Sequence, residues 1–544
     1  MNKYNYLKPF IKNIRYRLFQ VILISFIIAG IQLVIPYLTK QIFDFGILGE
    51  EIRTLILLVS VLILLYILST ILMCFTNKLF AEASNEFILS VQKTVYSRMI
   101  RMPLEFFDKN ENGYIMNRMN EVNNLSTLFS PMVMNIFISL ISFIGAIIMI
   151  IRSSLPLFLF VLICIPILYV LSRISTGRIR NSSIEYSEAS AKAAGDLEES
   201  INGVREVKCL NVEVKKIREI HSSIHKVTEK AIKRSVSTFV GTEFIGLFAN
   251  VTNALFILIV GVFIIRGDLK IGDYIALTCY IGQVFAPVQQ VSMFSLSIQP
   301  GLVTLSRLGM FFDNKTENEI DGNVRIDGIQ SILFERVNFQ YPNTEKWVIT
   351  DLSFDARRGD KVVIIGHNGT GKSTVAKLLL GFYKNYYGNI YFDENEEKTI
   401  DINSLRKKIA IVSQNIFLFR GTIEENITMG IDNVLDSELE KVIEMCNLRQ
   451  LVNQARETNF LITEGGKNLS GGQIQRIAVA RALIRKVDVF IFDEINNNLD
   501  EEAKQNIYNL IREKLQDKIV LIITHDYSLR KMADKIIDLD EEEK

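Results

Sequence analysis

The sequence predicts two parts of different fold class. The first is an all-α membrane domain of six helices with long helical extensions, and the second is an α/β domain with a helical subdomain. Six apolar stretches, each near the ~20 residues that a helix needs to cross a bilayer, lie within the first 300 residues. Beyond them, short strand-like runs alternate with helical patterns, which is typical of a mainly parallel sheet covered by helices.

A chain of 544 residues is long enough for two or three domains. We place the membrane domain at residues 1–310, a linker at 311–331 and the α/β domain at 332–544. The net charge of +1 argues against a nucleic-acid partner, because such proteins usually carry a basic stripe. The five cysteines lack the spacing of a disulfide framework or a zinc site.

The six expected spans are well separated except for the third and fourth, which form a tight hairpin. They cover residues 18–38, 55–75, 132–151, 155–172, 239–265 and 274–298. Five cations precede the first span, whereas the next loop (46–54) contains Glu50 and Glu51 with only Arg53. By the positive-inside rule, both termini and the two long loops face the cytoplasm of a multi-pass cell-membrane protein. A signal peptide is disfavoured, because the first run is too long and lacks a small-residue cleavage site.

Strands are expected at 333–339, 361–365, 408–412, 488–492 and 518–523. The strand at 361–365 leads into the loop Gly366-His367-Asn368-Gly369-Thr370-Gly371-Lys372-Ser373-Thr374, and a helical pattern follows. Glycines in this context let the backbone wrap around phosphates, Lys372 reaches the outer phosphates and the Ser373 hydroxyl binds Mg²⁺, with Thr374 adjacent. The loop therefore predicts a nucleotide site.

Two carboxylates follow the buried run at 489–492. Asp493 is placed at the end of a strand, where it can hold a magnesium ion on the phosphates through water. A second serine-glycine turn, Ser470-Gly471-Gly472-Gln473, opens a helix whose N–H groups can also hold a phosphate. Two such segments in one domain suggest that a nucleotide is clamped between two copies.

These motifs, in this order, resemble the ATP-binding cassette (ABC) transporters, specifically exporters that fuse six spans to one ATPase. The resemblance covers essentially the entire chain and implies a half-transporter that hydrolyses ATP with Mg²⁺ to drive export of a substrate by alternating access. It implies a dimer with a second copy or a paralogue, in which two ATP molecules lie between the cassettes. It also implies coupling loops near residues 112–119 and 211–216 that touch the ATPase.

The resemblance assigns further roles residue by residue. Glu494 is expected to be the general base, and His525 the switch histidine at the γ-phosphate. Adenine is expected to stack on Tyr341, while Gln414 contacts Mg²⁺. Two more residues are expected to act in communication: Asp500 between the ATP sites, and Glu464 at the coupling loops. Two features depart from the family pattern: the segment 495–500 and the single residue Gly465.

Some alternatives stay open at this point. The cassette could drive a membrane regulator or channel without transport, although no additional domain or ion-selective pore is recognisable. The substrate could be a peptide, a lipid or an amphipathic small molecule. Glu243 is a candidate substrate contact because ionisable residues in membranes are often functional. Gln283, Gln289 and Gln290 could line a polar cavity or bond to one another between helices.

Overall fold

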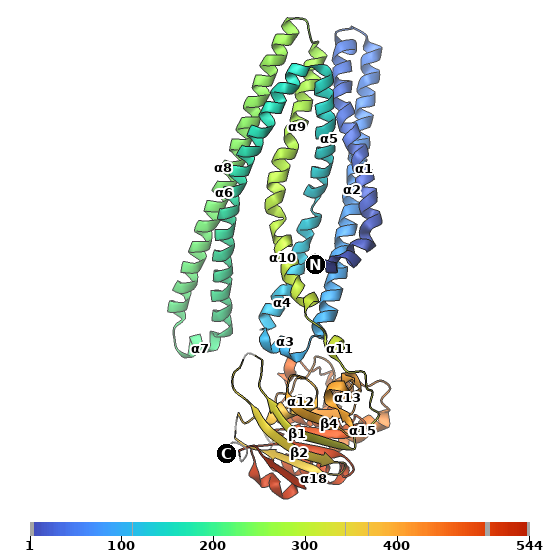
Figure 1. Ribbon diagram of the computed structural model, residues 1–544, viewed down its shortest axis with the longest axis vertical. Helices are drawn as coiled ribbons and strands as arrows, with labels where there is room; N and C mark the ends of the chain where they lie inside the picture. The colour runs from blue at the N-terminus through green and yellow to red at the C-terminus, as the bar shows by residue number, and fades with distance from the viewer. Residues whose placement is uncertain (1–4, 111, 343, 368, 496–500, 541–544) are drawn as a thin grey trace. The chain divides into compact units, whose positions relative to one another are not determined.

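The computed structural model describes residues 5–110, 112–342, 344–367, 369–495 and 501–540 (Figure 1). It divides into two compact units. The membrane unit comprises Met1–Ser97 and Met116–Asp313, and the α/β unit comprises Arg98–Ile115 and Asn314–Lys544. The segment 98–115 of the first long loop is thus part of the α/β unit.

Six helices of the described residues are long and apolar enough to cross a membrane, which confirms the number of predicted spans. Their orientation in the membrane stays a prediction. The helices that carry the spans are α1 (Lys8–Gln41), α2 (Ile52–Ile100), α5 (Pro131–Ser153), α6 (Leu155–Asn202), α8 (Glu213–Ile265) and α9 (Ile271–Ser297).

The hairpin between the third and fourth spans is as tight as predicted, because only Ser154 separates α5 from α6. Ser154 has an extended backbone (φ −164°, ψ 121°). Proline occupies the first turn of both helices, where the backbone N–H that it lacks would have no partner within the helix.

Helices α6 and α8 lie side by side along their length and form a long hairpin closed by α7 (Val204–Cys209) (Figure 1). The short helix of this loop therefore ends before residues 211–216, which form a turn and the start of α8. Four apolar side chains near the tip of the hairpin are exposed: Ile201, Val204, Leu210 and Val214.

The α/β unit contains a parallel sheet and a second sheet that the sequence did not predict. The parallel sheet has the order β6-β7-β8-β3-β9, and the other is antiparallel with the order β2-β1-β4-β5. The five predicted strands all form, but the first of them, β1, belongs to the antiparallel sheet. The strands are β1 (Ser331–Phe339), β2 (Ile349–Arg357), β3 (Lys361–Ile365), β4 (Tyr387–Phe392), β5 (Asn395–Glu396), β6 (Ile409–Val412), β7 (Val489–Asp493), β8 (Ile519–Ile523) and β9 (Lys535–Asp538).

Two apolar cores hold this unit together. One lies between the two sheets and α12, and the other joins the parallel sheet to the helical subdomain of α14 to α17. Every residue of β7 and β8 is buried, as expected for central parallel strands covered on both faces. The helices are α12 (Lys372–Leu379), α13 (Ile402–Arg406), α14 (Ile423–Thr428), α15 (Asp436–Met445), α16 (Arg449–Thr458), α17 (Gly471–Leu483) and α18 (Glu501–Lys514).

Shorter elements complete both units. The remaining α-helices are α3 (Leu104–Lys109), α4 (Asn112–Glu121), α10 (Gln299–Asp313) and α11 (Glu317–Ile320). The 3₁₀ and π elements are η1 (Asn5–Leu7), the π-helical η2 (Ile42–Ile47), η3 (Val122–Phe129), η4 (Glu397–Thr399), η5 (Glu464–Gly466) and η6 (Tyr527–Met532).

A buried carboxyl group lies in the α/β unit. The Glu397 side chain is fully buried, and its Oε2 accepts a hydrogen bond of 2.9 Å from the Tyr386 hydroxyl. Its Oε1 has no hydrogen-bond partner among the described residues. Burial therefore raises the pKa of Glu397, because the charged form loses its hydration.

This raised pKa predicts a pH-dependent stability. The stability that the protonated Glu397 carboxyl contributes is fully present below the pKa of Glu397 in the unfolded chain. It is lost as the pH rises through the higher pKa of Glu397 in the folded protein. We expect Glu397→Gln to have little effect near about pH 4 and to be more stable than the parent near about pH 8. Unfolding of the α/β unit can be followed by the emission of Trp347, the single tryptophan. Parallel stability curves for the two proteins over this pH range would contradict the prediction.

Candidate active site

The phosphate-binding loop lies between β3 and the start of α12, as predicted. Its last glycine, Gly371, is the N-cap of α12 and has a left-handed backbone (φ 91°). A Cβ atom at this position would lie 2.7 Å from the Val348 carbonyl oxygen. Only glycine satisfies both conditions, and the free N–H groups of α12 thereby face the loop.

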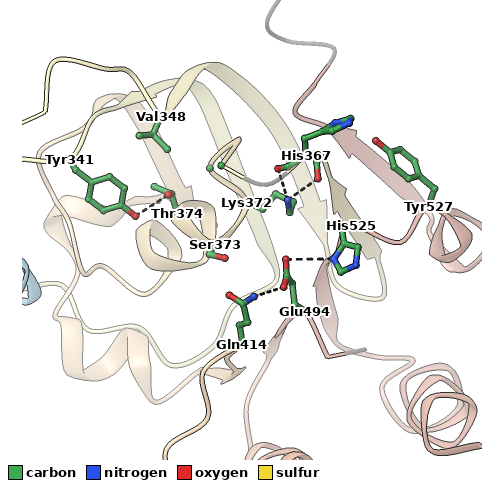
Figure 2. Close-up of a pocket in the computed structure, with 13 residues that line it drawn as sticks. Tyr341, Val348, His367, Lys372, Ser373, Thr374, Gln414, Glu494, His525 and Tyr527 are labelled. Atoms are coloured by element: carbon green, nitrogen blue, oxygen red, sulfur yellow. Dashed lines mark hydrogen bonds and ion pairs between the residues drawn. The ribbon is translucent and has the colours of Figure 1, made fainter. Parts of the chain in front are cut away.

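Lys372 is almost fully buried although it is charged. Its ammonium group donates hydrogen bonds of 2.7 Å to the carbonyl oxygens of Gly366 and His367 (Figure 2). The lysine thus spans its own loop and holds the loop open. A bound polyphosphate would compete for the same ammonium group, because a phosphate oxygen carries more negative charge than a carbonyl oxygen.

Asp493 ends the buried strand β7 and is only 6 % exposed. Its Oδ1 accepts a hydrogen bond of 3.1 Å from the Ser373 hydroxyl. Burial raises the pKa of Asp493, and the Ser373 bond opposes this shift. A hydroxyl and a carboxylate side by side form an oxygen donor set of the kind that Mg²⁺ prefers.

Glu494 lies between the two other predicted catalytic residues. Its Oε2 accepts a hydrogen bond from the Gln414 amide, and its Oε1 lies 3.7 Å from His525 Nδ1 (Figure 2). The Glu494 backbone is left-handed (φ 53°), and its N–H donates to the Ile523 carbonyl of the neighbouring strand. This unusual backbone turns the side chain away from the sheet and toward the phosphate-binding loop.

Tyr341 lies at the other end of the site. Its hydroxyl is 3.0 Å from the Thr374 hydroxyl, and the Lys377 ammonium group is 5.2 Å from the centre of its ring. Edge-to-face contacts with Phe339 (5.1 Å) and Tyr383 (5.4 Å) fix the ring orientation. An aromatic ring held in this way is suited to stack on a planar base.

Most of these residues line one cleft of about 830 Å³, but Asp493 is not among the lining residues (Figure 2). The cleft brings together eleven of the predicted site residues: Tyr341, Gly366, His367, Gly369, Gly371, Lys372, Ser373, Thr374, Gln414, Glu494 and His525. Val348 and Tyr527 also line the cleft, but no sequence motif pointed to them. Thr370 lies in the loop and donates to the His367 carbonyl. Asn368 and Asp500 fall outside the described residues.

The serine-glycine turn does not line this cleft. Ser470 caps α17: its hydroxyl accepts from the Gln473 N–H (3.3 Å), and the Gln473 side chain accepts from the Ser470 N–H (2.8 Å). This capping box gives the N–H groups of Ser470 and Gln473 one hydrogen-bond acceptor each, and it makes the turn rigid. Ser470 and Gly471 are exposed at the helix N-terminus, where a phosphate would be favoured.

The C-terminal strand end also reaches the phosphate-binding loop. Both carboxylate oxygens of Asp540 accept from the His367 N–H (3.0 and 3.1 Å), and Oδ2 is 2.7 Å from the His367 ring nitrogen. These contacts, the backbone bond first, lower the pKa of Asp540. Asp540 follows no motif, so only the pairing of β9 with β3 shows its role.

The candidate substrate residues have different environments. The Gln283 amide donates to the Gln32 carbonyl (2.9 Å), and Gln290 accepts from Ser139 (2.9 Å), so both bond to neighbouring helices. The polar-cavity interpretation and the interhelical interpretation both stay open, since a residue can serve both. Glu243 is exposed on α8. Glu464 is exposed at the start of η5, before the serine-glycine turn.

Comparisons with known proteins agree with this geometry. The family model described as ABC transporter transmembrane region matches residues 18–288, and the ABC transporter model matches residues 349–497. The uncharacterized ABC transporter ATP-binding protein YfiC of Bacillus subtilis is 28% identical over 95% of this chain and 86% of its own length. The ATP-dependent lipid A-core flippase 2 of Colwellia psychrerythraea is 25% identical over 98% of this chain and 91% of its own length.

A solved structure shows the same fold. The structure of a bacterial Atm1-family ABC exporter with ATP bound superimposes with a TM-score of 0.84. The alignment covers 97% of this chain and 94% of that chain, at 23% sequence identity. At this identity the likeness establishes the fold alone.

The contacts of Asp540 predict a specific loss of nucleotide affinity. We expect Asp540→Ala to raise the ATP concentration at half-maximal hydrolysis about fivefold, a modest change because solvent screens the contact. The maximal rate should not change, because Asp540 touches no residue that acts on the reacting atoms. Asp517→Ala is a matched control, since Asp517 pairs with Arg358 (3.1 Å) away from the loop. Equal ATP requirements in both variants would refute this role.

Proposed function

Since this chain belongs to the ABC transporter family, as an exporter-type half-transporter whose ATPase drives export, we propose that two chains complete each other's ATP sites. The second chain is another copy or a paralogue. One observation carries the proposal: eleven of the expected site residues line the cleft, whereas the serine-glycine turn does not, and its Ser470 and Gly471 are exposed elsewhere on the same unit. A head-to-tail pair of cassettes would bring the turn of one chain to the cleft of the other.

The residues of each site divide the chemistry between them. Lys372 and the N-terminus of α12 bind the phosphates, and Tyr341 stacks on adenine. Ser373 and Asp493, with Gln414, are the oxygen donors that fit Mg²⁺, which would neutralise phosphate charge when bound. Glu494 orients and deprotonates the attacking water, Gln414 holds the carboxylate in place, and His525 donates to the γ-phosphate.

Completion of the two sites supplies the free energy for movement. A ligand shifts a conformational equilibrium only by its difference in affinity for the two states. ATP has such a difference, because only the closed pair adds the contacts of Ser470 to Gln473. Closure of the cassettes then moves the cytoplasmic extensions and turns the membrane domain outward, and hydrolysis resets the cycle.

The tip of the α6–α8 hairpin provides a contact surface for this movement. Val204 is 50% exposed, Leu210 71% and Val214 63%, although all three are apolar. Exposed apolar side chains on a helical tip are typical of a protein interface. We infer that this tip contacts an ATPase unit, as the second coupling loop does in the exporters that the sequence resembles. The ATPase and both termini then lie in the cytoplasm, where the cations of the first segment also place them.

The role of Glu494 can be tested by one substitution. Glu494→Gln keeps a side chain that can bond near Gln414 but cannot accept a proton, so we expect hydrolysis to fall by about a hundredfold or more. Binding of a fluorescent ATP analogue should persist, because the phosphate contacts are untouched. The measurement is phosphate release by the full-length protein in lipid. Turnover equal to that of the parent would remove Glu494 from the mechanism.

The shared-site arrangement predicts complementation. A Lys372→Ala chain and a Ser470→Arg chain should each be inactive alone, since every site of such a homodimer is damaged. In the mixed dimer, one site combines both defects, and the other combines an intact loop with an intact turn. We therefore expect differently tagged chains, co-expressed and purified as mixed dimers, to recover ATPase activity. Two Lys372→Ala chains with different tags are the control, and no recovery in the mixed dimer would contradict shared sites.

A further inference from the structure

The first cytoplasmic loop is anchored on the α/β unit through residues 98–115, which we call the docking segment. Met102 is buried, and Leu104 packs against the core of the two sheets. The Arg101 carbonyl accepts a hydrogen bond of 2.8 Å from the Glu317 N–H, and Arg98 pairs with Glu319 (3.1 Å). These contacts hold the start of the segment on the α/β unit.

One buried side chain meets the end of the docking segment. The Tyr383 hydroxyl donates a hydrogen bond to Asp108 Oδ2. Tyr383 is only 1 % exposed and is among the largest fully buried side chains of the protein, yet Asp108 itself is exposed. The ring is therefore enclosed by its neighbours and responds to their positions, while the carboxylate that it holds lies at the surface on a segment that leads into the membrane unit.

The other side of Tyr383 faces the nucleotide site. Its ring makes an edge-to-face contact with Tyr341 at 5.4 Å and an interplanar angle of 89°. The Tyr341 hydroxyl bonds in turn to Thr374 in α12, next to Ser373 (Figure 2). Three direct contacts thus join the helix that binds phosphate to the docking segment, in the order Thr374, Tyr341, Tyr383 and Asp108.

We propose that Tyr383 is a positioning residue that transmits nucleotide occupancy from Tyr341 to Asp108 of the docking segment. The inference rests on the proposed function, and it identifies the residue that links the nucleotide site to the docking segment. A base stacked on Tyr341 restricts the tilt of its ring. Because the ring edge of Tyr341 is packed against Tyr383, the preferred position of Tyr383, and with it that of its hydroxyl, changes with occupancy.

The protonation of Tyr383 preserves its hydrogen bond to Asp108. Burial and the neighbouring Asp108 carboxylate both raise the pKa of Tyr383, burial being the larger cause. The hydroxyl thus keeps its proton and remains a donor to Asp108 at physiological pH. A hydrogen bond from a neutral donor to a charged acceptor is stronger than one between two neutral groups.

The test separates closure from nucleotide binding. Spin labels at Lys226→Cys, an exposed position on α8, report the distance between the two chains once the exposed Cys74, Cys209 and Cys279 are replaced by serine. The background is Glu494→Gln, full-length in lipid nanodiscs. The closure constant is the ratio of closed to open dimers. With saturating ATP, we expect Tyr383→Phe to lower this constant about tenfold, because the variant loses one hydrogen bond to a charged acceptor. Affinity for ADP, which cannot complete the interface, should stay within about twofold.

A matched control distinguishes transmission from general stability. Tyr386 lies three residues further along the same segment, and its hydroxyl also donates to a buried carboxyl, Glu397, at 2.9 Å. Tyr386→Phe should lower the stability of the α/β unit but leave the closure constant unchanged. Asp108→Ala, which removes the acceptor, should reproduce the loss seen in Tyr383→Phe. The double variant should show no further loss, because both substitutions remove the same bond.

Several outcomes would overturn the inference. Normal closure in Tyr383→Phe would remove the residue from the transmission, and an equal defect in Tyr386→Phe would show that only stability matters. Additive losses in the double variant would show that Tyr383 and Asp108 act separately. Absence of any ATP response in the Glu494→Gln background would instead contradict the proposed function itself, and the inference would fall with it.

Discussion

The site depends on one partly buried contact, the hydrogen bond between Asp493 at the end of β7 and Ser373 at the start of α12. It joins two segments that are 120 residues apart in the chain. A carboxylate buried in this position would be costly without a partner. The serine hydroxyl meets part of that cost, and the remaining charge favours a cation. The same strand end places Glu494 next to Gln414 and His525, so the proposed metal donors and the proposed base share one support.

The proposed nucleotide contacts fall into two groups on the α/β unit. The phosphate-binding loop is fixed by the left-handed Gly371, by Lys372 within the loop and by Asp540 outside it. The serine-glycine turn is fixed by the capping box of Ser470 and Gln473. Because the loop and the turn each hold their shape without the other, each already has its final geometry before a partner chain binds. Preorganisation of this kind lowers the ordering cost of association.

Some features were not predictable because they depend on contacts between distant residues. The antiparallel sheet was missed, since β2, β4 and β5 have short or mixed polar patterns and gain their stability by pairing with β1. Tyr527 reaches the cleft only through the turn after β8, and Asp540 reaches His367 of the phosphate-binding loop only through the pairing of β9 with β3. The short helix of the second long loop, at 204–209, is separated from α8 by Asn211, which has a positive φ.

The sequence by itself determined the six spans, the order of the two domains and the residues of the phosphate-binding loop, because hydrophobic length and local glycine-lysine-serine patterns act over a few neighbouring positions. Only the tertiary structure decided which of these residues share a cleft and which do not. It placed Tyr383 between Tyr341 and Asp108, and it left Ser470 exposed away from Lys372. The reason is physical: such contacts are set by strand order and core packing, which no local pattern encodes.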